Sequence, residues 1–360
     1  MTNPPDVYVM DTSFTTIGII DNYKSLLWTE RYSECGDFEL YVIASSEIFK
    51  MVKQDYYLKI RGSNTVMIVE NIQIETDAES GDMAKFSGRS LESILDRRVI
   101  WNEISVDGAN LHNLIKRMIT ENIISPSSFT SLRQISNFRF ADSSDATITG
   151  LTISLQVIGE NLYEEIKQLC NTCGIGFRIR LNVSNEFVFS LYRGTNRSYS
   201  QSNNPYVTFS KSFDNLISSQ YLLSNTSYKN ASLVYGKRND TVIRNELHVG
   251  SYSGLSRREL LTDISGVTKE DGESDDSYNR KLLNKAQEDL ANAKASQAFE
   301  ADAETQVMYV YGTDFYMGDI VQFVNEYGLG ASARVVEFIH SWDIDGYKSY
   351  PTFTIETAEE

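Results

Sequence analysis

The chain of 360 residues is poor in the residues on which disulfide bonding, metal binding and nucleic-acid binding depend. Three cysteines cannot form a disulfide framework, and they fit a protein made in a reducing cytoplasm. The 33 lysines and arginines are outnumbered by 49 aspartates and glutamates, which gives a formal net charge of −16. Such a surplus of acids disfavours binding to nucleic acid and to anionic membrane surfaces. The partner classes that remain are other proteins, sugars and small ligands.

Long apolar runs and proline are also scarce. No run approaches the length of about eighteen apolar residues that a transmembrane helix needs, so we expect no membrane insertion. The N-terminal "MTNPPDVYVMD" lacks the basic region and apolar core of a signal peptide. Only 5 prolines stand against 21 tyrosines and 17 phenylalanines, a balance that favours strands over linkers.

Alternation of apolar and polar residues predicts strands along much of the chain. It is clear in "ENIQIETD" (70–77) and in "GFRIRL" and "EFVFSLY", which the polar turn "NVSNE" joins into a hairpin. Helical spacing of apolar residues predicts four helices, at 89–98, 109–120, 160–173 and about 275–298. The last of these is strongly polar, so we expect it to face solvent or a partner. The pattern indicates an α+β, β-rich fold with mostly antiparallel sheets.

The pair Cys170 and Cys173 has the C-x-x-C spacing of zinc and redox sites. A zinc site needs four ligands, and no second pair or nearby histidine supplies them. A thioredoxin-like site places the pair at a helix N-terminus, whereas this pair falls at the C-terminus of the helix 160–173, before a capping Gly174. We therefore predict that both cysteines are packing residues.

The three histidines are equally weak candidates for chemistry. His112 begins a predicted helix, His248 falls in a loop-like stretch, and His340 shares a strand face with Phe338 and Trp342. None is placed with a nucleophile or a second metal ligand. A pair of carboxylates at the separation used by glycosidases cannot be recognised from sequence. We predict no catalytic constellation, no metal site, no cofactor and no enzymatic activity.

The stretch "LLWTERYSECGDFELYV" (26–42) crowds four acids, an arginine and a cysteine between aromatic residues. Its alternation predicts a β-hairpin with Gly36 at a positive φ angle in the turn. We expect Trp28 to pack on Phe38, and Glu30, Arg31 and Glu39 to pair across the strands. Such a hairpin is more typical of an assembly or packing element than of an active site.

Six blocks of the chain, in order, carry a family resemblance. They are "SLLWTERYSECGDFEL" (25–40), "SGRSLESILDRRVIW" (87–101), "FSKSFDNLISSQY" (209–221), "YKNASLVYGK" (228–237), "GLSRRELL" (254–261) and "YGTDFYMGDIVQFVNEYGLGASARVVEFI" (311–339). Together they resemble the tail-tip baseplate hub proteins of phages and prophages of Gram-positive bacteria, the tail-associated or Tal-type proteins. These are similar to the trimeric central hub of contractile-tail baseplates.

The resemblance implies a homotrimer that caps or continues the tail tube. Each subunit would contribute tail-tube-like β-barrel domains: a discontinuous first barrel (1–96 plus 205–236), an inserted helix-and-sheet domain (97–204), and a second barrel with the polar helix (237–360). The implied partners are a distal tail protein, a tape-measure protein and receptor-binding or tail-fibre proteins. DNA would pass through without specific binding. The location would be the virion tail tip, after synthesis in the bacterial host cytoplasm.

Two of the matched blocks supply candidate interface residues. These are Trp28, Glu30, Arg31 and Asp37 of the hairpin, and Arg89, Arg97 and Arg98 of "GRS…DRR". For each of them the alternative is local packing or a surface salt bridge within the chain.

A different class of function stays open. Many relatives carry a long C-terminal extension with wall-cleaving or receptor-binding modules, whereas this chain ends at "FTIETAEE", after a strand expected near 351–355. We therefore expect the hub module alone. The alternative is a tail-associated cell-wall hydrolase or a carbohydrate-binding protein, for which exposed aromatics of "YRGTNRSYSQSNNPY" (192–206) would form the groove.

Overall fold

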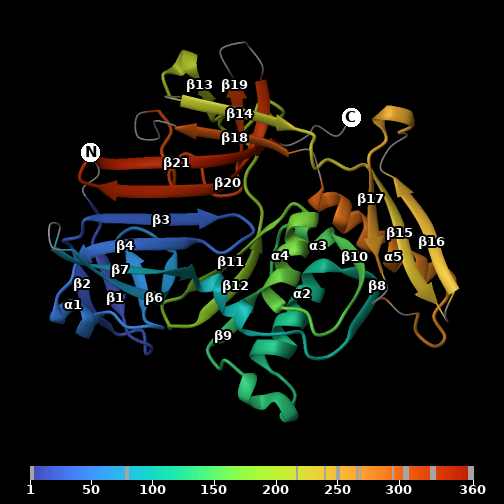
Figure 1. Cartoon of the computed structure of the whole chain (residues 1–360), viewed down its shortest axis with the longest axis horizontal. Coiled ribbons are helices and arrows are strands. Elements are labelled where there is room, and N and C mark those ends of the chain that lie inside the picture. Colours follow the sequence, from blue (N-terminus) through green and yellow to red (C-terminus); the bar gives the residue numbers. More distant parts are fainter. Residues whose placement is uncertain are drawn as a thin grey trace.

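One large mixed sheet runs through the structure, with helices and three smaller sheets beside it (Figure 1). The computed structural model describes residues 4–77, 81–215, 218–238, 241–248, 252–264, 267, 269–293, 296–302, 308–324 and 330–355. Within these ranges, no helix is both long enough and apolar enough to cross a membrane. The β-rich, α+β class expected from the sequence is confirmed.

The large sheet has thirteen strands, eleven of them in the order β14-β18-β21-β20-β3-β4-β7-β6-β5-β1-β2, while β19 lies beside β20 and β13 beside β19. Its strands are β1 (Val7–Met10), β2 (Thr16–Ile20), β3 (Ser25–Arg31), β4 (Asp37–Ile43), β5 (Tyr57–Ile60), β6 (Val66–Asp77), β7 (Gly81–Ser90), β13 (Thr208–Ser210), β14 (Ser218–Ser224), β18 (Ser296–Asp302), β19 (Ile320–Val324), β20 (Gly330–Asp343) and β21 (Gly346–Ile355). All neighbours in it are antiparallel except β13 and β19. The short helix α1 (Ser46–Met51) follows β4.

The centre of this sheet joins distant parts of the chain. Strand β20 pairs with β3, so the C-terminal strands and the N-terminal strands form one continuous surface (Figure 1). Directly opposite residues of an antiparallel pair share a face, so Phe338, His340 and Trp342 lie on the face of Glu30, Trp28 and Leu26. That face packs on apolar cores, and the other face is open.

A block of helices and two small sheets covers residues 91–192. Its elements are the 3₁₀ helix η1 (Leu91–Arg97), β8 (Ile104–Asn110), α2 (Leu111–Ile119), its π-helical continuation η2 (Thr120–Ile124), the 3₁₀ helix η3 (Ser128–Arg133), β9 (Phe138–Ala141), α3 (Ala146–Gly150), β10 (Thr152–Val157), α4 (Leu162–Thr172), β11 (Gly176–Leu181) and β12 (Phe187–Tyr192). The Asn161 side chain accepts from the first-turn amides of α4, and Gly174 follows its end at φ 64°. These two residues fix where the predicted helix begins and ends.

A third unit combines a three-stranded sheet with the longest helix. The strands are β15 (Ala231–Arg238), β16 (Thr241–His248) and β17 (Glu259–Asp263), and short 3₁₀ helices η4 (Lys211–Phe213) and η5 (Gly254–Ser256) precede β14 and β17. Helix α5 (Asp275–Asn292) begins after Ser274, whose side chain accepts from the Ser277 amide. All four helices predicted from the sequence are therefore present, the first as a 3₁₀ helix.

Two expectations need correction. Gly36 does not take a positive φ angle; instead, a Cβ placed there would lie 2.1 Å from the Thr29 carbonyl oxygen, so close backbone approach explains the glycine. The closed β-barrels implied by the resemblance are not seen among the described strands, because their pairing follows an open path from β14 to β2.

The domain division at residues 96, 204 and 236 stays a prediction. Within the segment 205–236, β13 pairs with β19 and β14 pairs with β18.

Candidate assembly site

The open face of the large sheet carries several ion pairs. At the join between β3 and β20, the Arg31 guanidinium contacts Asp37 at 2.5 Å and Glu337 at 2.6 Å. It also donates to the carbonyl of Cys35 in the hairpin turn. The hairpin predicted from the sequence is thus confirmed. Its Arg31 pairs with Asp37 of the hairpin and with Glu337 of the C-terminal strand β20.

The ion pairs continue across β4, β7 and β6. Glu39 pairs with Lys85 of β7 at 2.7 Å, and the Lys85 ammonium also lies over the Tyr41 ring. Arg89 binds Glu70 through two parallel hydrogen bonds of 2.9 Å. Paired charges of this kind keep a strand face wet and hold long side chains in fixed positions. The expected pairing of Glu39 with the other hairpin charges is wrong.

The candidate interface residues lie in different environments. On the open face, Asp37 and Arg89 keep 43% and 39% of their side chains exposed, and Arg31 keeps 27%. Arg97 lies at the end of η1, 46% exposed, and contacts Asp55 at 3.0 Å. Arg98 donates to the Arg133 carbonyl oxygen.

Trp28 lies on the opposite face of the same strand. It is fully buried, and its ring packs against Phe38 at 6.1 Å between centroids, as predicted. Its contribution is therefore to the core of this chain.

Glu30 lines a cavity of about 570 Å³ between the large sheet and strand β11. Its carboxylate accepts from the Thr65 hydroxyl at 2.7 Å and from the Tyr311 hydroxyl at 2.7 Å. Burial opposes ionisation, but the nearby Arg180 charge and these hydrogen bonds outweigh it and lower the pKa of Glu30. Glu30 therefore joins three segments that are distant in the sequence.

His340 faces the same cavity. Its ring stacks on Trp342, and its Nδ1 lies 2.8 Å from the Tyr347 hydroxyl. Burial lowers the pKa of His340 to about 4, so the imidazole is neutral near pH 7. This agrees with its interpretation as a packing residue. His248, expected in a loop, ends strand β16.

The two cysteines of the C-x-x-C motif lie at the C-terminal end of α4, where the sequence predicted them. Cys170 is fully buried and Cys173 is half-buried, and both thiols are free. Burial raises the pKa of Cys173 to about 11, which keeps the thiol protonated. Within the described ranges, no three His, Cys, Asp or Glu side chains are arranged to hold a metal ion.

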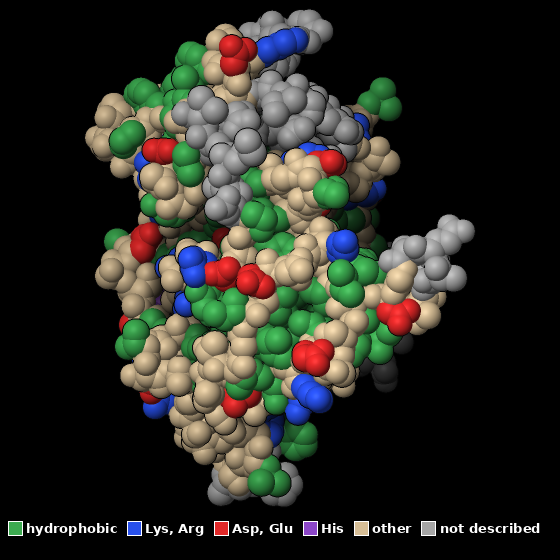
Figure 2. All heavy atoms as spheres, turned by 90° about the vertical axis from the view of Figure 1, so that its left-hand side faces the viewer, with side chains coloured by type: hydrophobic (Ala, Val, Ile, Leu, Met, Phe, Trp, Pro, Cys, Tyr) green, Lys and Arg blue, Asp and Glu red, His purple; other side chains and the backbone are tan. Residues whose placement is uncertain are grey.

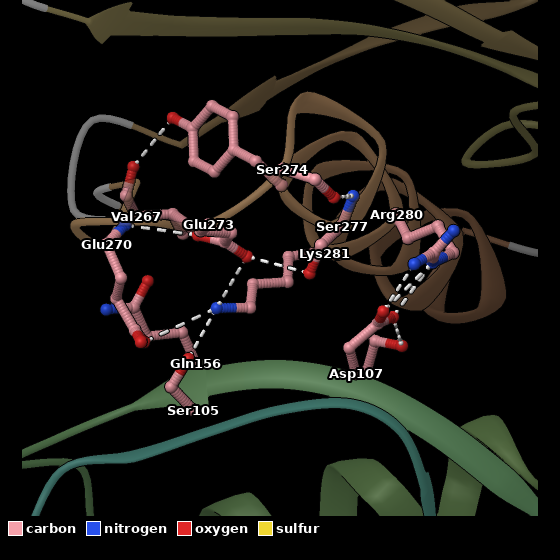
Figure 3. Close-up of polar contacts among 12 residues, drawn as sticks. Ser105, Asp107, Gln156, Val267, Glu270, Glu273, Ser274, Ser277, Arg280 and Lys281 are labelled. Atoms are coloured by element: carbon pink, nitrogen blue, oxygen red, sulfur yellow. Dashed lines mark hydrogen bonds and ion pairs between the residues drawn. The ribbon is translucent and has the colours of Figure 1, made fainter.

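Helix α5 contacts the helical block through charged side chains, although the sequence suggested that it faces solvent or a partner (Figure 3). The Lys281 ammonium contacts Glu273 at 3.0 Å and the Ser105 hydroxyl of β8. Arg280 forms a two-pronged contact with Asp107, also on β8. These charged side chains of α5 have charged or polar partners on β8 and in the segment before the helix. A polar helix can therefore pack here without leaving charges unpaired.

Solved structures with the same fold include tail proteins of bacteria and prophages. The prophage MuSo2 43 kDa tail protein of Shewanella oneidensis aligns with a TM-score of 0.61 and 13% identity, covering 97% of this chain and 98% of that chain. The tail protein of Neisseria meningitidis MC58 aligns with a TM-score of 0.59 and 10% identity, over 97% and 96% of the two chains. Prophage tail protein gp18 of Listeria monocytogenes aligns with a TM-score of 0.53 and 14% identity, over 99% and 95%.

The fold is thus that of a phage or prophage tail protein. The chain belongs to the Siphovirus ReqiPepy6 Gp37-like protein family, whose family model matches residues 6–353. No curated protein sequence matches it. The resemblance to phage tail proteins drawn from the six sequence blocks is confirmed, and a family of tail proteins is consistent with a non-enzymatic role.

The partners of Glu30 were not predicted from the sequence. Thr65 lies just before β6, Arg180 lies on β11, and Tyr311 lies in the segment before β19. The available signal was Arg180 itself, because it lies with Arg178 on the polar side of a predicted strand.

Proposed function

We propose that this chain is a structural baseplate hub at the phage tail tip. Three copies would form a ring that caps or continues the tail tube and docks a distal tail protein, a tape-measure protein and receptor-binding or penetration components. The observation that carries the proposal is the continuous open sheet face, on which Arg31, Asp37 and Glu337 join N-terminal and C-terminal strands. A continuous sheet face that carries paired charges and is accessible to water would suit the lining of a channel.

Closure into tube-like barrels would occur between copies. Strands β2 and β14 stand at the two ends of the open path, so in the described residues each has one neighbour. Free strand edges are templates for pairing with another chain. We propose that these edges meet other subunits, and that the first barrel, the inserted domain and the second barrel divide the chain at residues 96, 204 and 236.

An apolar surface supports a contact at β2. Figure 2 views the end of the molecule where β2 and α1 lie, and hydrophobic side chains gather in the middle of that face with few charges among them. Ile17 and Ile19 of β2 are 42% and 48% exposed, and Ile43 at the end of β4 is 58% exposed. A contiguous exposed apolar patch is typical of protein–protein contacts. Among the interface residues expected from the sequence, Arg97 lies away from the open face, at the end of η1, and its side chain is 46% exposed, as a subunit contact needs.

The charge of the chain fits a conduit for DNA. A net charge of −16 would repel passing DNA and keep it from binding to the wall. The chain would need no catalytic residue for this role. Mapping the charges onto an assembled ring tests the idea, since a basic lumen would contradict it.

Native mass spectrometry of the chain with its distal tail protein tests the assembly. We expect three copies, that is three times 40.8 kDa, in the complex. Ile19→Lys should reduce trimer formation, whereas Leu132→Lys, at a fully exposed position of η3, should not. A complex with another number of copies, or wall-cleaving activity of the purified chain, would contradict the proposal.

A further inference from the structure

We propose that the cavity beside Glu30 is a binding site for a carboxylate group of another protein chain, held by Arg178 and Arg180. The two arginines are neighbours on one face of β11, the edge strand of the sheet β11-β12-β9. The other faces of the cavity come from β3, from the segment before β6 and from β20. Clefts where several parts of a chain meet are common binding sites. The inference does not depend on the hub role or on a trimer.

The local structure directs both arginines into the cavity. Phe177 and Ile179 of β11 are buried in the core of the helical block, and strand alternation turns Arg178 and Arg180 the other way. The free edge of β11 is fixed by Glu92, whose carboxylate accepts from the Ile179 amide at 2.7 Å. The Arg178 guanidinium also lies over the Tyr192 ring, 4.5 Å from its centroid. The site is therefore formed before any ligand arrives.

Both guanidinium groups keep most of their donors available. In the described part of the chain, neither forms an ion pair: Arg178 contacts the Ser190 hydroxyl at a long 3.4 Å, and Arg180 donates to the Thr65 hydroxyl at 2.8 Å. The nearby carboxylates have donors of their own, because Glu30 accepts from Thr65 and Tyr311 and Glu92 accepts from a backbone amide. A guanidinium has five N–H donors in a planar fork that matches a carboxylate.

The charges around the site favour a singly charged ligand. Four arginines line the cavity, Arg31, Arg61, Arg178 and Arg180, against three carboxylates, Glu30, Glu34 and Glu92. A phosphate group carries a charge near −2 at neutral pH and would be repelled by three carboxylates more strongly than a carboxylate ligand would. The tyrosine rings of the wall, Tyr192 and Tyr311, offer apolar surface for the group that bears the carboxylate. An aspartate or glutamate side chain, or the end of a chain, has this chemistry.

Arginine-directed labelling of the full chain with phenylglyoxal, read residue by residue by mass spectrometry, tests the site. The probes are a blocked tripeptide with a central glutamate, the same peptide with glutamine, a peptide with a free C-terminus, and inorganic phosphate. We expect both carboxylate peptides or one of them to slow labelling of Arg178 and Arg180, which identifies a side chain or a chain end as the source. Equal protection by the glutamine peptide, or stronger protection by phosphate, would overturn the proposal.

Calorimetric titration with the protective peptide provides the second test. Arg178→Gln should weaken binding about tenfold or more, since charge-assisted hydrogen bonds are lost. Arg178→Lys, which keeps the charge but not the fork, should weaken it less. The matched control is Arg139→Gln on β9, whose side chain pairs with Glu186 outside the cavity and should leave affinity unchanged. Unchanged affinity in both Arg178 variants, with the melting temperature of the wild type, would exclude the site.

Discussion

Arg31 and Glu337 are separated by 306 positions in the sequence, and their side chains meet at 2.6 Å. They face each other across the junction of β3 and β20, where the first and last parts of the chain become one sheet. Their side chains are 27% and 23% exposed, so solvent screens the pair only in part. The contact shows how the open face is continued from one end of the chain to the other.

Replacing Arg31 by alanine should destabilise the chain by about 1–3 kcal/mol, because Glu337 and Asp37 lose a charge-assisted donor in a partly buried place. Urea unfolding monitored by fluorescence measures the change. The control is Arg61→Ala, whose side chain is 69% exposed in its pair with Asp6 and should change stability by less than about 0.5 kcal/mol. Equal effects of the two substitutions would show that the ion pair at the junction adds no more to the free energy of unfolding than an exposed surface pair does.

Trp28→Ala should be among the more damaging single substitutions, at about 3–5 kcal/mol, because the fully buried ring leaves a cavity beside Phe38. Trp28→Phe should cost less, since among the described residues the indole N–H has no hydrogen-bond partner. Trp101, at 52% exposure, is the matched control, and its alanine variant should stay close to wild type. Denaturant titration of all three variants decides, and a mild Trp28→Ala phenotype would disprove the core role.

Gly36→Ala should weaken the hairpin, because the added methyl group would overlap the Thr29 carbonyl oxygen, which is backbone and cannot turn aside. We expect a clear loss of stability and faster amide exchange in β3 and β4. Gly150→Ala is the control, since nothing lies within 4 Å of a Cβ there and alanine favours the helix. If Gly36→Ala melts like the wild type, the close approach of the two strands is not what requires glycine.

Helix α5 should be held less firmly at higher pH. Burial, and then the charge of Glu288 on α5, raises the pKa of Glu165 on α4 to about 7 from its ordinary 4.5. The folded state therefore holds this proton more tightly than the unfolded state does. The stabilising contribution is complete below pH 4.5 and is lost as pH rises through about 7.

Glu165→Gln should remove that part of the pH dependence, which amounts to about 1–3 kcal/mol. Amide exchange of α5 and thermal unfolding across this pH range give the readout. Glu164→Gln serves as control because the Glu164 side chain is 63% exposed. A variant at Glu165 that keeps the wild-type pH profile would contradict the assignment.

Local features of the fold were predictable from the sequence because they depend on neighbouring residues. Alternation identified the hairpin of Trp28 and Phe38, and a polar turn identified the β11–β12 hairpin. The charge partners were not predictable in the same way. Arg31 contacts Asp37 because the register of the hairpin places the two side chains together. Glu337 comes from β20, a strand that no local sequence pattern connects to β3.

The polar helix shows the same limit. Its composition suggested a solvated surface, yet Lys281 is only 4% exposed. Glu273 precedes it by two turns, but Ser105 and Asp107 come from β8, far away in sequence, and only the tertiary fold brings them to α5. The surroundings of Glu30 could not be predicted for the same reason, since Thr65, Arg180 and Tyr311 belong to three separate segments.

The most direct test is an electron cryomicroscopy reconstruction of the tail of a phage particle that carries this chain. We predict three copies in a ring at the end of the tail tube, with β2 at a subunit contact and the face of Arg31, Asp37 and Glu337 toward the channel. A chain found elsewhere on the particle, or a tail-tip ring with that face turned outward, would contradict it.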